Sequence, residues 1–166
     1  MSRIQRIRLT TLLAFVTLAS QWARAEPFGF VVPLEERESG HYYVHGALGE
    51  GVETDFLVDT GSGYVALSKE TFDRVRHRPG TKHLRDIVGA MANGKLMKVP
   101  IYRLAELTIS DDCHLQDVEV AVFPAGSRDI LGLSVLRRVE PFAMHMSPPM
   151  LRVSTCEKSL QASADS

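Results

Sequence analysis

The chain has 166 residues, of which 45% are hydrophobic and 23% charged, and a formal net charge of −1 at pH 7. Residues 1–25 hold four of the 19 basic residues and none of the 20 acidic ones, so the remainder has 15 basic and 20 acidic groups, a net charge of −5. Neither value favours nucleic acid or an anionic membrane surface as a partner.

Residues 1–25 have the pattern of a secretory signal peptide. Arginines open the segment, an apolar run spans Leu9–Ala19, and Ala23-Arg24-Ala25 is a small-x-small cleavage site. The apolar run is too short to cross a bilayer, which takes about 20 residues, so no stable membrane insertion is expected. Cleavage would leave a periplasmic or secreted protein with one domain at 26–156 and a flexible polar tail at 157–166.

The rest of the chain predicts an all-β domain, a small closed β-barrel or sandwich with one or two short helices. One helix is expected from the capping residue Ser68 to about Arg76, before Pro79-Gly80, and a second over Leu133–Val139, before Pro141. Gly, Asn, Asp and Pro turns separate the strand-forming runs. The expected strands are 30–34, 42–47, 52–58, 64–67, 86–91, 96–102, 104–109, 118–123, 142–146 and 150–153.

The segment Phe56-Leu57-Val58-Asp59-Thr60-Gly61-Ser62 places an acidic residue where an apolar strand ends. Such a carboxylate loses hydration unless it is compensated, a cost often accepted for chemistry. The tetrapeptide from Asp59 taken alone favours an Asx turn. Two such carboxylates facing each other would instead share a proton, one acting as a base towards water and the other as an acid. A chain with one such motif needs a second copy, in a two-fold homodimer, to form that pair.

With Ile130-Leu131-Gly132 downstream, this segment resembles the signature of the retropepsin-like aspartic proteases, and most closely their small exported or membrane-tethered bacterial members. The hairpin at Ala92-Asn93-Gly94 and the segment Leu131–Leu136 fit the same pattern, so the resemblance covers about residues 40–153. It implies a retropepsin-type fold, a homodimer, a polypeptide substrate, and a mechanism with no cofactor and no metal.

The resemblance also implies roles for individual residues. Asp59 would be the catalytic carboxylate, Thr60 would bond across the dimer axis, Gly61 would permit the tight backbone, and Ser62 would bond the carboxylate from outside. Ala92, Asn93 and Gly94 would form a flap that closes over the substrate. Gly132 would let its strand pack under the loop, with Ile130 and Leu131 buried beneath it.

The two cysteines, Cys113 and Cys156, predict one disulfide in an exported protein, with two unlinked thiols as the alternative. They do not make a zinc site by themselves. His41 and His45 would lie roughly 13 Å apart along a strand, too far to share a metal ion directly.

Two other functions remain open at this point. The domain could be a catalytically inactive, exported peptide-binding module of the same fold. It could also be an exported structural β-domain in which Asp59 is only a turn residue.

Overall fold

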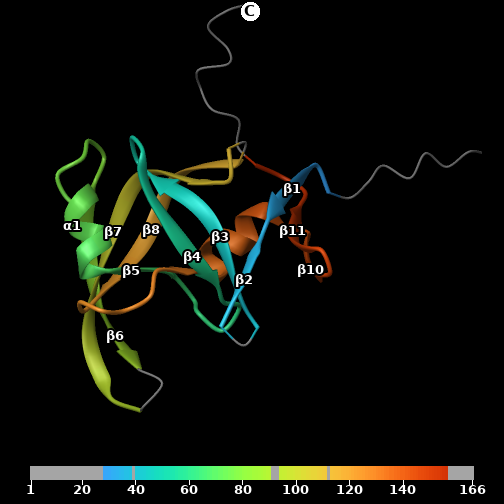
Figure 1. The fold of residues 1–166 in the computed structure, drawn as a ribbon. Helices are drawn as coiled ribbons and strands as arrows, with labels where there is room; N and C mark the ends of the chain where they lie inside the picture. Colours follow the sequence, from blue (N-terminus) through green and yellow to red (C-terminus); the bar gives the residue numbers. More distant parts are fainter. Residues whose placement is uncertain (1–27, 39, 91–93, 112, 157–166) are drawn as a thin grey trace, which may run out of the picture.

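The computed structural model describes residues 28–38, 40–90, 94–111 and 113–156. Strands dominate this part of the chain, as Figure 1 shows, and the expected all-β class is confirmed. The elements in chain order are β1 (Phe30–Pro33), β2 (Glu35–Arg37), β3 (His41–Leu48), β4 (Val52–Val58), β5 (Val65–Ser68), α1 (Lys69–Val75), β6 (Lys82–Ala90), β7 (Leu96–Ile109), β8 (Cys113–Phe123), β9 (Ile130–Leu131), α2 (Leu133–Leu136), the 3-10 helix η1 (Arg137–Val139), β10 (Phe142–Met146) and β11 (Pro149–Val153).

The strands form two sheets. The larger has the order β2-β3-β4-β9-β5-β8-β7-β6, and β3 also pairs with β7, so the pairing runs in a ring from β3 back to β3. The smaller sheet has the order β1-β11-β10 and lies at the opposite side of the domain from α1 (Figure 1). Pro33 is tolerated because β1 is an edge strand of this smaller sheet.

The structure extends several expected strands. The runs 96–102 and 104–109 form one strand, β7, because Arg103 between them pairs with Glu119 and the register with β8 continues unchanged from Ile101 to Ile109. Strand β6 begins at Lys82 and β8 at Cys113, both earlier than expected. Two short strands, β2 and β9, are not among the strands expected from sequence periodicity, since a two- or three-residue strand has too few residues to show a period.

Buried aliphatic and aromatic side chains form the main core between the ring of strands, α1 and the smaller sheet. Phe56, Leu107 and Leu136 are among its fully buried members. A second, smaller cluster of Val99, Ile101 and Ala121 lies in the β6–β7–β8 region, with Tyr64 packed against it.

The local signals at α1 are confirmed. Ser68 caps the helix by accepting a hydrogen bond from Thr71 N at 3.1 Å, and Glu70 lies in the first turn, where a negative charge suits the helix dipole. Cys113 and Cys156 form the expected disulfide, which ties the start of β8 to the end of the described chain. No helix of the described segments has the length and apolar character needed to cross a membrane.

Candidate active site

Asp59 follows directly after β4, which pairs in parallel with β9. The backbone N–H of Asp59 donates to Leu131 O at 3.1 Å, and that of Leu57 donates to Asp129 O at 2.9 Å. The Asp59 segment and Ile130-Leu131 are therefore adjacent, hydrogen-bonded strands of the large sheet. Asp59 itself is partly buried, so its carboxylate keeps access to solvent.

The chain turns sharply after Asp59. Asp59 Oδ1 accepts a hydrogen bond from Gly61 N at 2.8 Å, and Asp59 O accepts one from Ser62 N at 3.2 Å. This is an Asx turn, and it holds the carboxylate in one orientation. A Cβ atom on Gly61 would lie 3.1 Å from Asp59 Oδ1, which is a tight contact and agrees with glycine at this position.

The neighbouring side chains differ in part from expectation. The Ser62 hydroxyl donates to Tyr64 O at 2.9 Å, so it braces the loop backbone where a bond to the carboxylate was expected. Thr60 is exposed on the loop, and its role across a dimer axis stays a prediction.

Gly132 supports the loop from below. A Cβ atom built on Gly132 would lie 2.1 Å from Tyr64 O and 2.8 Å from Ser62 O, so only glycine fits under this backbone. Leu133 N donates to Ser62 O at 2.8 Å and Ser134 N donates to Gly63 O at 3.1 Å, so the start of α2 holds the loop in place.

The two residues before Gly132 differ in burial. Leu131 is fully buried, whereas Ile130 is partly buried and pairs with Leu57 on one side and Ala66 on the other. Ile130-Leu131 therefore supports the loop as a strand of the large sheet.

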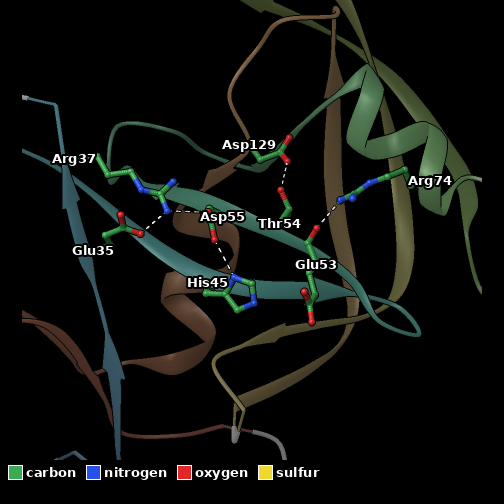
Figure 2. Close-up of polar contacts among 8 residues, drawn as sticks. All are labelled: Glu35, Arg37, His45, Glu53, Thr54, Asp55, Arg74 and Asp129. Carbon is green, nitrogen blue, oxygen red and sulfur yellow. Dashed lines mark hydrogen bonds and ion pairs between the residues drawn. The ribbon is translucent and has the colours of Figure 1, made fainter.

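A second aspartate, Asp129, organises the same region, and the sequence assigned it no role. Its side chain is 8% exposed and accepts hydrogen bonds from Thr54 Oγ1 at 2.6 Å, Ser68 N at 2.7 Å and Thr71 Oγ1 at 2.6 Å. Figure 2 shows the contact with Thr54 on β4. No local signal identifies it, because its partners Thr54 and Thr71 are 75 and 58 positions away in the sequence.

An ion pair lies beside the end of the loop. Arg85 on β6 donates to both carboxylate oxygens of Glu119 on β8, at 3.0 and 2.6 Å, and reaches the Tyr64 hydroxyl oxygen at 3.4 Å. The hydrogen bond from Arg85 holds the pKa of Glu119 below its usual value. This contact links the base of the β6–β7 hairpin to the segment that follows Asp59.

The β6–β7 hairpin carries the segment that was expected to form a flap, and that role stays a prediction. Its pairing runs from Lys82↔Arg103 to Ala90↔Leu96, and it extends beyond the rest of the sheet (Figure 1). Gly94 near its tip is exposed with φ +78°, while Ala92 and Asn93 lie outside the described residues. Val88 and Leu96 close to the tip are 70% and 71% exposed, so this end of the hairpin presents apolar surface.

The described residues contain no group of three or more His, Cys, Asp or Glu placed to hold a metal ion. The two histidines considered earlier have separate partners, since His41 Nδ1 lies 2.7 Å from Glu38 O and His45 Nδ1 lies 2.9 Å from Asp55 Oδ1.

Comparison with known proteins agrees with this geometry. The family model described as "gag-polyprotein putative aspartyl protease" matches residues 47–138, more than half of the chain. Among solved structures, the chain is similar to a retropepsin-like aspartic protease from Rickettsia conorii, with a TM-score of 0.55 and 20% sequence identity over 77% of this chain and 92% of that chain. At this identity the likeness establishes the fold. No curated protein matches the chain significantly.

Proposed function

This chain belongs to the retropepsin-like gag-polyprotein aspartyl protease family, and we propose that it is an exported, homodimeric aspartic endopeptidase whose catalytic carboxylates are the two copies of Asp59. The observation that carries the proposal is the geometry of the Asp59 loop. The carboxylate is oriented by Gly61 N, lies at the end of a strand fixed by Leu131 and Gly132, and keeps access to solvent.

The proposed chemistry needs two carboxylates that share one proton. The ionised Asp59 takes a proton from a water molecule, whose oxygen attacks the carbonyl carbon of the scissile peptide bond. The protonated Asp59 of the other copy donates its proton to the carbonyl oxygen, giving a tetrahedral diol. Proton transfer to the amide nitrogen then releases the two peptides.

A two-fold axis beside the loop would supply the second carboxylate. Strand β10 offers an edge for such a contact, because β11 is its sole partner among the described strands. Antiparallel pairing of an open edge with a second copy would extend the smaller sheet across the axis.

The β6–β7 hairpin would close over a polypeptide substrate and exclude water from the reacting bond. The exposed apolar side chains of Val88 and Leu96 support this role, since a substrate or a second flap could cover them. The disulfide between Cys113 and Cys156 agrees with folding in an oxidising compartment after removal of residues 1–25.

The test is cleavage of unfolded casein at mildly acidic pH by the exported protein and by its Asp59→Asn variant, with molar mass measured alongside. We expect cleavage by a dimer and its loss in the variant. Equal cleavage by both proteins would overturn the assignment of Asp59. A strict monomer that cuts would overturn the paired mechanism, and peptide binding without cleavage would indicate the inactive binding module.

A further inference from the structure

A hollow of about 500 Å³ lies between α1 and the ends of β7 and β8. We call it the α1–β7 groove. None of its lining residues belongs to the Asp59 loop, although Lys98 lies on the β6–β7 hairpin. The lining residues that matter for the argument are Lys69, Phe72 and Arg76 of the α1 segment and Lys98, Pro100 and Tyr102 of β7.

The floor of the groove is apolar and aromatic. The ring centroids of Phe72 and Tyr102 are 4.3 Å apart, and Phe72 is 6% exposed, so the two rings fix α1 on the sheet. Lys98, Pro100 and Tyr102 alternate along β7 and therefore share one face of the strand. A hollow of this volume with an apolar floor is in the size range of ligand sites, about 300–1,000 Å³.

The rim of the groove is cationic. Among the described residues, Lys69, Arg76 and Lys98 line it together with one carboxylate, Asp73. Lys69 and Arg76 both contact Asp73, and Lys98 Nζ lies 2.8 Å from Asp86 Oδ2 at the neighbouring strand. Each ammonium has three N–H donors and the guanidinium has five, so these contacts leave further donors for an incoming anion.

We propose that the α1–β7 groove binds an extended polypeptide segment in which acidic side chains flank an aromatic or aliphatic one, and that this segment belongs to the substrate. The apolar side chain would occupy the Phe72–Tyr102 floor while the carboxylates meet the cationic rim. The assignment to a substrate rests on the proposed protease function, but the binding itself does not.

The short stretch of chain between the Asp59 loop and the groove supports a polypeptide as the ligand. Strand β5 connects the Asp59 loop to the groove, and Tyr64 and Lys69 are five residues apart, roughly 16 Å in an extended chain. One extended substrate could therefore reach both places. The groove would select substrates that carry an acidic and apolar segment beside the cleaved bond.

The test uses the exported protein with Asp59→Asn, so that the probe is not cut. The probe is the fluorescein-labelled peptide Gly-Glu-Phe-Glu-Leu-Gly, and its comparator has Gln in place of both Glu residues. Fluorescence anisotropy at low salt gives the affinity for the protein, for the Lys69→Gln/Lys98→Gln double variant and each single variant, and for Lys82→Gln. Lys82 is a matched control, an exposed lysine on β6 that does not line the groove.

We expect the acidic peptide to bind about fivefold or more weakly to the double variant, to bind Lys82→Gln with unchanged affinity, and to lose affinity as salt is added. We also expect weaker binding of the Gln peptide. Equal affinity for the double variant and for Lys82→Gln, or no binding at all, would overturn the proposal. Melting temperatures show that each variant is folded.

The two proposals fail in different ways. If the groove binds the peptide as described but the unmodified protein cuts no polypeptide, the protease function is wrong and the groove stands as a peptide site. If the protein cuts casein but the groove substitutions leave the peptide affinity unchanged, the groove proposal is wrong and the protease function stands.

Discussion

Asp129 and Asp59 lie at opposite ends of the parallel strand pair β4–β9, and their side chains have opposite surroundings. Asp129 is buried and its carboxylate accepts from three donors, supplied by Thr54, Ser68 and Thr71. Asp59 is partly buried, and the donor that it accepts from within the described residues is Gly61 N. A buried carboxylate that already accepts from three fixed donors has little capacity left for a substrate or a water molecule, whereas a partly buried one oriented by one donor keeps that capacity.

The difference indicates that Asp129 serves the fold and that Asp59 is available for chemistry. Asp129 joins β4, the end of β5 and α1 at one point, and these elements position the loop that carries Asp59. Loss of Asp129 should therefore act first on stability, while loss of the Asp59 charge should act first on chemistry. The predictions below test that contrast, beginning with the largest expected effect.

Asp59→Asn should lower activity by about 10⁴-fold, because the amide can neither accept a proton from water nor share one with its mate. The melting temperature should stay within about 2 °C, since the single bond from Gly61 N can still be accepted by the amide oxygen. Activity on casein and thermal unfolding measure the two effects. A variant that unfolds at much lower temperature would contradict the contrast, because it would give Asp59 a structural role.

Asp129→Ala should reduce the free energy of unfolding by about 3 kcal/mol, since it leaves the buried donors of Ser68 and Thr71 and the partly buried donor of Thr54 without this acceptor. Asp129→Asn should cost less, because an amide keeps one acceptor and can donate to the two threonine hydroxyls. Urea denaturation gives both values. Equal, small losses in the two variants would show that water replaces the carboxylate and that the cluster does not anchor the loop.

The sequence predicted Asp59 and missed Asp129 for a physical reason. The Asp59 segment has a local pattern, apolar strand then Asp-Thr-Gly, that can be read within seven residues. The role of Asp129 depends on Thr54 and Thr71, which are 75 and 58 positions away and meet it only after the sheet has formed. Its buried state follows from tertiary contacts that no short window contains.

The same dependence on distant residues explains which other parts of the fold could be predicted from the sequence and which could not. Turns and caps such as Ser68 at α1 depend on neighbouring residues and were predicted correctly. The two-residue strand β9 exists because Leu57 and Val58 pair with it, so no period within residues 130–131 could indicate it. The family resemblance suggested that Gly132 packs closely under the loop. Only the structure shows how small the distance from Gly132 to the loop backbone is.

Gly132→Ala should test how tightly β9 and the start of α2 hold the Asp59 loop. The added methyl group would meet Tyr64 O at 2.1 Å, so the backbone must shift at a cost of about 2 kcal/mol. The shift would displace the Asp59 carboxylate, and activity should fall by about 100-fold if Asp59 is catalytic as proposed. Gly63→Ala is the matched control, because a Cβ atom there has no neighbour within 4 Å. A Gly132→Ala protein with normal activity would show that the loop adjusts without moving Asp59.

Asp55 on β4 provides a third case, an aspartate with charged partners but more solvent. Its Oδ1 lies 2.9 Å from His45 Nδ1 and its Oδ2 2.9 Å from Arg37 Nη2, and its side chain is 36% exposed (Figure 2). The hydrogen bonds from His45 and from Arg37 hold the pKa of Asp55 below its ordinary value. Because exposed ion pairs are screened, Asp55→Asn should reduce the free energy of unfolding at pH 7 by less than about 1 kcal/mol, well below the effect at Asp129.

The pH dependence of this loss has a definite sign. A carboxyl whose pKa is lower in the folded protein contributes stability above its unfolded pKa, and that contribution disappears as the pH falls through the folded pKa. The difference between the unmodified protein and Asp55→Asn should therefore be full at pH 7, shrink below about pH 4, and approach zero when the carboxyl is protonated. Urea denaturation at several pH values measures it. A difference that persists in acid would mean that Asp55 acts through packing, like a buried group, and exposure would then not be what separates it from Asp129.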